Sequence, residues 1–161
     1  ELEDDRPEDL VGIYNIDMDA FEGVLKLNTM GTVYPLLAFA KYMVKQGGGS
    51  IINFASMNTY CPLTRCFAYA MSKAAVSNLT QSFAAYYAPA NIRINAIAPG
   101  FILTDMTAAL GESVQEELLK TIPLRRCGTP EDVAGVALFL ASDLSSYVTG
   151  QVINCCGGMN C

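Results

Sequence analysis

Apolar and polar positions along the chain follow two patterns, one with the period of a helix and one typical of short buried strands. After an acidic first segment, apolar residues recur every three or four positions until the glycines at 47–49, which stop a helix. Asp17 or Asp19 can cap the start of this helix. Pro35 lies inside it and predicts a kink or a break into two pieces.

Three short apolar runs alternate with further helical segments in the rest of the chain. Because short buried strands separated by helices are typical of βαβ units, the pattern predicts an α/β fold with a parallel sheet and helices on both faces. The strands are predicted at Ser50–Ala55, Ile92–Ala98 and Gln151–Asn154, and the helices at 67–87, at 111–122 and after the start signal Thr129-Pro-Glu-Asp.

Composition narrows the class of protein. The chain has 161 residues, the size of one domain, of which 52% are hydrophobic and only 16% are charged. We expect so apolar a chain to bury surface against other subunits, as a homo-oligomer. The small residues of the helix at 67–87 could pack against such a subunit or, equally, against the sheet.

Charge and hydropathy exclude two kinds of partner. The net charge of −6 leaves no basic stripe for the phosphates of a nucleic acid. No apolar run reaches the length of a membrane span without charges or breaks, and no signal peptide is visible. We therefore expect a cytoplasmic protein that binds neither nucleic acid nor membrane.

Cysteine and histidine content limits the available chemistry. The six cysteines form no C-x-x-C pair and histidine is absent, which favours reduced thiols over a zinc site or a disulfide framework. A cysteine-based redox module is a minor alternative, because no cysteine has a recognisable reactive setting. Acid–base chemistry at neutral pH must then use Tyr, Lys, Cys or carboxylates.

The stretch from Ser56 to Lys73 contains the groups best suited to such chemistry. Tyr69 and Lys73 are four positions apart and would share one helix face. An ammonium beside a phenol favours the phenolate, as proton transfer requires, and a nearby serine hydroxyl can hydrogen-bond a carbonyl oxygen. The alternative interpretation is a surface lysine and a half-buried tyrosine. Ser56 follows the first strand and Pro99–Thr104 follow the second, where a ligand crevice is expected.

Several motifs occur in an order that one known family shares. Asn28, in Leu-Asn-Thr-Met-Gly, matches that family's helix asparagine, and Ser56, thirteen residues before Tyr69, matches its catalytic serine. Tyr69-x3-Lys73 is its signature pair. Through these and the later matches the chain resembles the short-chain dehydrogenases/reductases over roughly residues 16–158. The later matches are Asn95-Ala-Ile-Ala-Pro-Gly-Phe-Ile-Leu-Thr104, Thr129-Pro-Glu-Asp-Val133, and Val148-Thr-Gly-Gln-Val-Ile153 followed by Gly157-Gly158.

This resemblance implies the C-terminal part of a Rossmann-type doubly wound parallel sheet, and hydride transfer between NAD or NADP and a carbonyl or alcohol. Tyr69 would give or take the hydroxyl proton, and Lys73 would assist it and hydrogen-bond the nicotinamide ribose. Ser56 would hold the substrate oxygen. Asn28 would anchor a water of the proton relay where the helix backbone is locally opened. The residues that would close on the nicotinamide are Pro99, Gly100, Ile102 and Thr104, with Thr104 and the backbone near Ile102 on its carboxamide.

The substrate is less closely defined by the resemblance. The segments Pro62–Arg65 and Tyr86–Pro89 are most similar to family members named D-mannonate oxidoreductases, which implies a sugar acid such as mannonate or fructuronate. Arg65 could clamp the carboxylate of such a substrate, or it could be a solvated loop arginine. Asn58 and Tyr60 could line the same pocket.

Two features depart from the family pattern. The Gly-rich turn that holds a dinucleotide pyrophosphate is absent, since neither G-x-G-x-x-G nor G-x-x-x-G-x-G occurs. Cys155-Cys156 stand where the family usually has an aspartate, and we expect both to be free thiols because a disulfide between neighbours is strained.

We therefore expect residues 1–161 to form a single domain, the C-terminal catalytic part of a Rossmann-type dehydrogenase without its N-terminal dinucleotide-binding half. The first predicted strand would then have an unpaired edge. Either the chain is part of a longer one, or a separate piece supplies the rest. In the alternative interpretation it is a non-catalytic remnant that serves as a binding or oligomerisation module.

Overall fold

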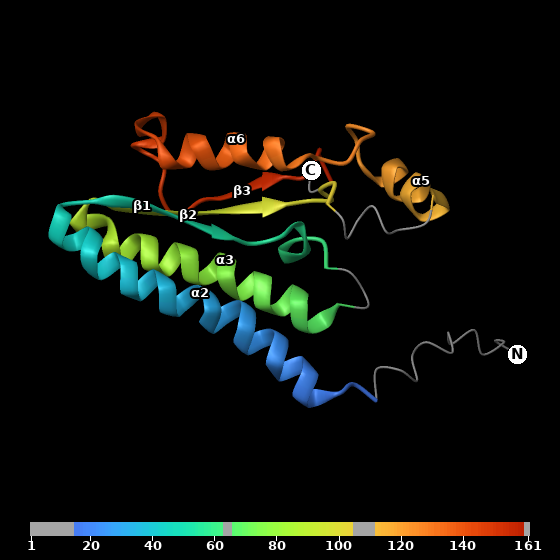
Figure 1. Cartoon of the computed structure of the whole chain (residues 1–161), viewed down its shortest axis with the longest axis horizontal. Coiled ribbons are helices and arrows are strands. Elements are labelled where there is room, and N and C mark those ends of the chain that lie inside the picture. Colours follow the sequence, from blue (N-terminus) through green and yellow to red (C-terminus); the bar gives the residue numbers. More distant parts are fainter. Residues whose placement is uncertain (1–14, 63–65, 105–111, 160–161) are drawn as a thin grey trace, which may run out of the picture.

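The computed structural model describes residues 15–62, 66–104 and 112–159, and it contains a three-stranded sheet between two layers of helices (Figure 1). In chain order the elements are α2 (Met18–Gln46), β1 (Gly49–Phe54), the short 3-10 turn η1 (Met57–Thr59), α3 (Phe67–Tyr87), η2 (Ala88–Ala90), β2 (Ile92–Pro99), α5 (Glu112–Thr121), α6 (Pro130–Ala141), η3 (Asp143–Ser145) and β3 (Val152–Cys155).

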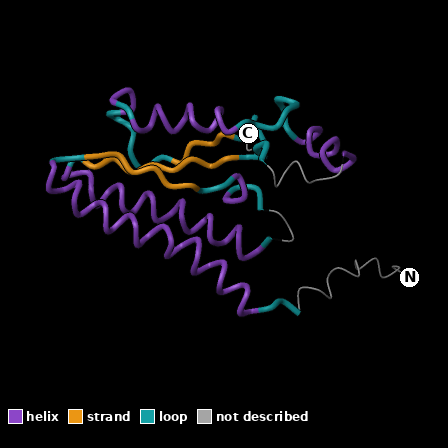
Figure 2. Tube along the Cα trace, viewed as in Figure 1, coloured by secondary structure: helices purple, strands orange, loops and turns teal. Residues whose placement is uncertain are grey.

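The sheet has the strand order β1-β2-β3, and both pairs of strands are parallel. Helices α2 and α3 cover one face, and α6 covers the other (Figure 2). β2 is the middle strand and is the most deeply buried, since neighbours cover both its edges and both its faces. These observations confirm the predicted parallel sheet with helices on both faces, and the predicted strand bounds are within one residue of those observed.

Helix α2 begins and ends at the residues that signalled it. The Asp17 carboxylate accepts a hydrogen bond from the backbone N–H of Ala20 at 3.1 Å, so Asp17 is the cap. Gly47 ends the helix with φ +91°, a conformation that favours glycine. Of the two alternatives predicted at Pro35, a kink or a break into two pieces, the break is wrong, because α2 continues through this residue. Burial of Leu36 against the core offsets the single backbone hydrogen bond that proline removes.

The start of α6 is fixed by a capping box and an ion pair. The Thr129 side chain accepts from the Asp132 N–H, and the Asp132 carboxylate accepts from the Thr129 N–H at 2.8 Å. The Arg126 guanidinium donates to both Asp132 oxygens, at 2.6 and 3.1 Å. Chiefly through these hydrogen bonds from Arg126, the pKa of Asp132 is lowered to about 2. The helix start predicted at Thr129 is confirmed, and the preceding loop is tied to it.

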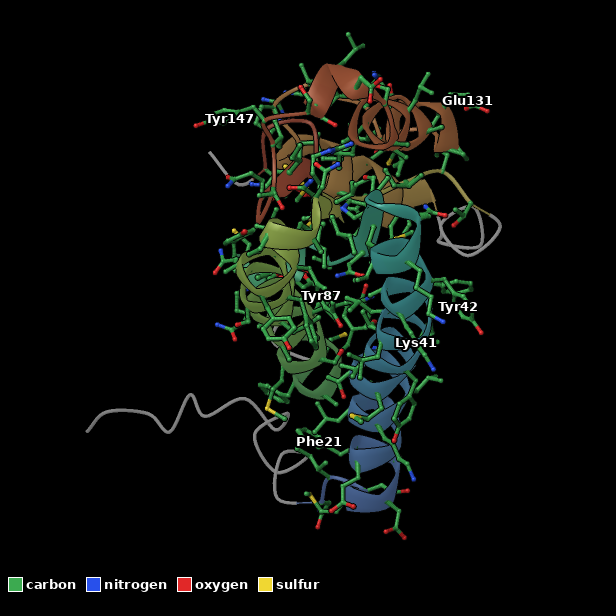
Figure 3. The ribbon with its side chains drawn as sticks, turned by 90° about the vertical axis from the view of Figure 1, so that its left-hand side faces the viewer. Phe21, Lys41, Tyr42, Tyr87, Glu131 and Tyr147 are labelled. Carbon is green, nitrogen blue, oxygen red and sulfur yellow. The ribbon has the colours of Figure 1, made fainter. Side chains whose placement is uncertain are left out.

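The small residues of α3 divide between two environments. Ser72, Ser77 and Thr80 are buried, and Thr80 Oγ1 accepts a hydrogen bond at 2.8 Å from the Asn53 side chain of β1. Ala74, Ala75 and Ala85 are exposed. Figure 3 shows that large side chains also point outward, with Tyr42 on α2 and Tyr147 beyond η3 directed away from the body of the chain.

Asn95 ties the middle strand to the segment that leads into β3. The side chain is fully buried, its Nδ2 donates to the Val148 carbonyl at 2.8 Å, and its Oδ1 accepts from the Gln151 N–H at 3.0 Å. The substitution Asn95→Ala would leave both backbone groups without partners, so we expect the free energy of unfolding in urea to fall by about 2–4 kcal/mol. Asn78→Ala on the exposed face of α3 is the matched control, with an expected change within about 0.5 kcal/mol. Equal effects of the two substitutions would contradict this role of Asn95.

Candidate active site at the carboxyl ends of the strands

Ser56 lies just past the end of β1 and is buried, with 6% of its surface exposed. The pairing with β2 continues up to the residue before Ser56, because the Ala55 N–H donates to the Ile97 carbonyl at 2.8 Å. Ser56 then caps η1, and its Oγ accepts a hydrogen bond from the Asn58 N–H at 3.2 Å. Because a backbone donor occupies the serine oxygen, the serine hydroxyl hydrogen is free to point toward another acceptor.

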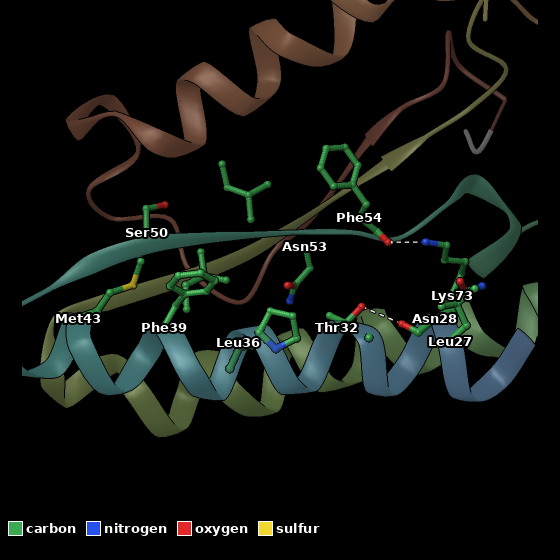
Figure 4. A pocket seen from close by; sticks show the side chains of 14 residues that line it. Leu27, Asn28, Thr32, Leu36, Phe39, Met43, Ser50, Asn53, Phe54 and Lys73 are labelled. Carbon is green, nitrogen blue, oxygen red and sulfur yellow. Dashed lines mark hydrogen bonds between the residues drawn. The ribbon is translucent and has the colours of Figure 1, made fainter. Parts of the chain in front are cut away.

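Lys73 connects α3 to the end of β1. Its Nζ donates to the Phe54 carbonyl at 2.9 Å, two residues before Ser56 (Figure 4). The same nitrogen lies 5.7 Å from the centre of the Tyr69 ring, one helical turn away. Burial lowers the pKa of Lys73. The helix spacing therefore brings the phenol ring and the ammonium together as predicted, and the hydrogen bond to Phe54 holds the ammonium at the end of β1.

Asn28 is held against the same turn of α3. Its Nδ2 donates at 2.9 Å to Ser72 Oγ, which in turn donates to the Tyr69 carbonyl at 2.7 Å. Ser72 is fully buried and was not among the predicted site residues, because a serine inside a helix carries no sequence signal of its own. The Asn28 carbonyl accepts from the Thr32 hydroxyl at 2.8 Å within the continuous helix α2. These bonds set the position of the helix turn that carries Tyr69 and Lys73.

Two pockets adjoin this turn. One is a cavity of about 620 Å³ between α2 and the outer edge of β1, lined among others by Asn28, Asn53 and Lys73 (Figure 4). The other has a volume of about 350 Å³ and lies between the first turns of α2 and α3. Tyr69 lines this second pocket, whose other walls are mostly apolar: Ile16, Ala20, Phe21, Val24, Phe67 and Ala68.

The segment after β2 is held in place by bonds from two directions. The Gly100 N–H donates to the Cys155 carbonyl at 2.9 Å. The Gly128 N–H donates to the Phe101 carbonyl at 2.9 Å, and the Leu103 N–H donates to the Gly128 carbonyl at 2.8 Å. Ile102 forms an isolated parallel bridge with Gly128. The segment that contains Pro99, Gly100, Ile102 and Thr104 therefore begins at the carboxyl end of β2. The neighbouring strand β1 ends just before Ser56.

The residues predicted to contact the substrate differ in their burial. Asn58 is buried in η1, and its Oδ1 has no hydrogen-bond partner among the described residues. Tyr60 is exposed at the end of that turn. Arg65 lies outside the described residues. Within the part of the chain that the structure describes, no cluster of three or more His, Cys, Asp or Glu side chains could bind a metal ion, and no helix has the length and apolarity to cross a membrane.

Comparison with known proteins identifies the family. A family model described as enoyl-(acyl carrier protein) reductase matches residues 10–160. The 3-oxoacyl-[acyl-carrier-protein] reductase of Chlamydia pneumoniae is 45% identical over 141 residues, which are 88% of this chain and 57% of that protein. The chain belongs to the short-chain dehydrogenase/reductase family. It spans little more than half the length of the curated relatives that it matches.

Solved structures of dehydrogenases/reductases share the fold described above. A 7α-hydroxysteroid dehydrogenase in complex with NADH and 7-oxo glycochenodeoxycholic acid is 36% identical, with a TM-score of 0.86 over 90% of this chain and 57% of that one. A Beutenbergia cavernae protein with bound NADP, described as an NAD(P)-dependent gluconate 5-dehydrogenase, is 37% identical, with a TM-score of 0.87 over 91% and 60%.

The bond between Asn28 and Ser72 can be measured by a double-mutant cycle. We expect a coupling free energy of about 0.5–1.5 kcal/mol between Asn28→Ala and Ser72→Ala in urea unfolding, because the hydrogen bond is partly buried. A cycle between Asn28→Ala and the distant, exposed Asn78→Ala should give no coupling. Additive effects of Asn28→Ala and Ser72→Ala would show that the bond does not join the two helices in solution.

Proposed function

We propose that the protein transfers hydride between NAD or NADP and a carbonyl or alcohol substrate, with Tyr69 as the acid and base. The observation that carries this proposal is the Lys73 ammonium, which is hydrogen-bonded to the end of β1 and lies 5.7 Å from the centre of the Tyr69 ring. Membership of the dehydrogenase/reductase family supports the proposal, as does the NADH in the related hydroxysteroid dehydrogenase structure.

Each catalytic side chain has a separate task in this proposal. In the direction of reduction, Tyr69 donates its hydroxyl proton to the substrate oxygen, and the Lys73 cation favours the phenolate that remains. Ser56 donates a hydrogen bond to the same oxygen, since the Asn58 N–H already occupies its acceptor side. Asn28 positions Tyr69 through Ser72. The dinucleotide, when bound, supplies or accepts the hydride.

The described residues fit one end of such a dinucleotide. The Lys73 ammonium borders the cavity beside β1 and could reach a ribose hydroxyl there. The fixed segment after β2 could hold the nicotinamide carboxamide through Ile102 and Thr104. The chain has no Gly-rich turn for the phosphates. We therefore propose that residues outside this chain hold the phosphates.

The outer edge of β1 is where those residues would join the sheet. In the described structure β1 pairs with β2 on one side only. Leu27, Phe39 and Phe54 line the cavity along this edge, and each is at least half exposed. An open strand edge beside exposed apolar side chains favours pairing with a further strand. We propose that the dinucleotide-binding half adds that strand, either from a longer chain or as a separate one.

Two observations point to different substrates. The likeness to D-mannonate oxidoreductases, with Arg65 as a possible carboxylate clamp, favours a sugar acid, and the relative described as a gluconate 5-dehydrogenase is consistent with it. The apolar walls of the pocket that Tyr69 lines favour a carbonyl flanked by an apolar group. A comparison of kcat/KM for fructuronate and for a 7-oxo bile acid would separate the two classes.

The alternative is a non-catalytic module, and it shares one feature with the enzyme. Exposed aromatic and aliphatic residues on the outer faces of α2 and α3 suit a homo-oligomer in either case: Tyr34, Leu37, Tyr42 and Tyr86. The two functions differ in whether Tyr69 matters. A module requires the surface of the helices, whereas the enzyme requires the phenolic hydroxyl.

Tyr69→Phe tests the proposed chemistry in a protein that includes the dinucleotide-binding half. We expect kcat/KM for NADH- or NADPH-dependent carbonyl reduction to fall by about 10²–10⁴-fold, because the proton donor is lost while the ring remains. Tyr147→Phe, at a fully exposed position beyond η3, is the matched control and should keep the wild-type rate. Activity of Tyr69→Phe near the wild-type value would reject the assignment, and an inactive wild-type protein would favour the module.

A further inference from the structure

Cys155 and Cys156 form a pair of thiols with no part in the proposed hydride transfer. They lie at the carboxyl end of β3, both are half-buried, and both are free. Both line a pocket of about 320 Å³ in which Phe101, Ile122 and Leu124 form an apolar wall and the ion pair of Arg126 and Asp132 a polar one. Two cysteines that follow one another in the chain and line the same pocket make a candidate site for a ligand that bonds to both.

A disulfide does not suit this pair. The two Cα atoms are consecutive across a trans peptide bond, about 3.8 Å apart, whereas disulfides need about 4.4–6.8 Å. The Cys155 carbonyl is also held in place, since it accepts from the Gly100 N–H at 2.9 Å. A ligand atom placed between the two sulfurs enlarges the ring and avoids this constraint.

The surroundings also disfavour a metal that needs more ligands. In the part of the chain that the structure describes, no three His, Cys, Asp or Glu side chains are grouped to hold one. Asp132 lines the same pocket, but Arg126 and Thr129 already occupy its carboxylate oxygens. The site therefore suits a thiophilic centre that is satisfied by two sulfurs.

We propose that Cys155 and Cys156 form a dithiol site for trivalent organoarsenicals and chemically similar groups that take two sulfur ligands, with the organic group against the apolar wall of the pocket. With phenylarsine oxide the reaction is a condensation. Two thiols and one PhAsO give PhAs(S-Cys)2 and one water; both S–H bonds break, two As–S bonds form, the protons leave with the oxygen, and arsenic stays trivalent. Burial, followed by the nearby Asp132 carboxylate, raises the pKa of the Cys155 thiol.

Binding of a ligand at this site would disturb the segment after β2. A Cβ atom placed on Gly100 would lie 2.8 Å from the Cys156 Cα, so the two backbones are in close contact. The next residue, Gly157, accepts a hydrogen bond at 3.1 Å from the Leu124 N–H. Closing a ring through Cys156 should therefore weaken the Gly100 and Leu124 hydrogen bonds and loosen the segment that contains Ile102 and Thr104.

The test uses the full chain with Cys61→Ser, Cys66→Ser and Cys161→Ser, which leaves Cys127 and the pair. We expect native mass spectrometry to show one phenylarsenic group per chain, resistant to a monothiol and released by 2,3-dimercaptopropanol. Replacing either Cys155 or Cys156 should weaken binding by about 10²-fold or more, because the second bond is lost. Each replacement is made with Ala and with Ser and checked by circular dichroism, so that the result does not depend on one variant folding.

Two further measurements distinguish a binding site that the fold pre-organises from two thiols that react without any help from the fold. Binding should be at least about tenfold weaker in the urea-unfolded chain, where the apolar walls are gone and the pair is no longer pre-organised. Amide exchange of Gly100 and Leu124 should become faster when the arsenical is bound. Equal affinity after unfolding, unchanged binding without Cys155 or Cys156, or unchanged exchange would overturn the proposal. None of these readouts requires the protein to be a dehydrogenase.

Discussion

The hydrogen bond from Lys73 Nζ to the Phe54 carbonyl is the constraint on which the candidate site depends. It joins the first turns of α3 to the last residue of β1, and so it brings a helix-borne ammonium next to the strand end that leads into Ser56. The Tyr69 ring lies one turn away on the same helix, within 5.7 Å of that ammonium. One bond thus relates the proposed acid, the cation that assists it and the hydroxyl that would hold the substrate.

The same bond lies at the open edge of the sheet. β1 has a strand partner on one side only within the described structure, and the cavity along its other side is bordered by Asn28 and Lys73. Two of the proposed site residues, Asn28 and Lys73, therefore line the surface to which a further strand would be added. This arrangement agrees with a chain that spans a little more than half of its curated relatives. The phosphate-binding groups would come from the other half.

The sequence was sufficient for the features that local chemistry decides. Asp17 or Asp19 and Thr129 predicted two helix starts, the glycines at 47–49 one helix end, and the apolar runs three strands. The structure confirms these elements and selects Asp17 as the cap of α2. The spacing of Tyr69 and Lys73 predicted their proximity. Tertiary contacts were not predictable in this way. Ser72 became part of the site only because α2 packs on α3, and the break expected at Pro35 failed because Leu36 is held in the core.

The central claim is that this chain contains the proton-transfer part of a dehydrogenase and that the residues that bind the dinucleotide phosphates lie outside it. Calorimetric titration with NADH, of this chain and of the same chain joined to a dinucleotide-binding half, tests it most directly. We predict binding by the joined protein and affinity at least about 100-fold lower for the chain alone, since two or more charge-assisted bonds to phosphate are missing. Equal affinity of the two proteins, or no binding by either, would contradict the claim.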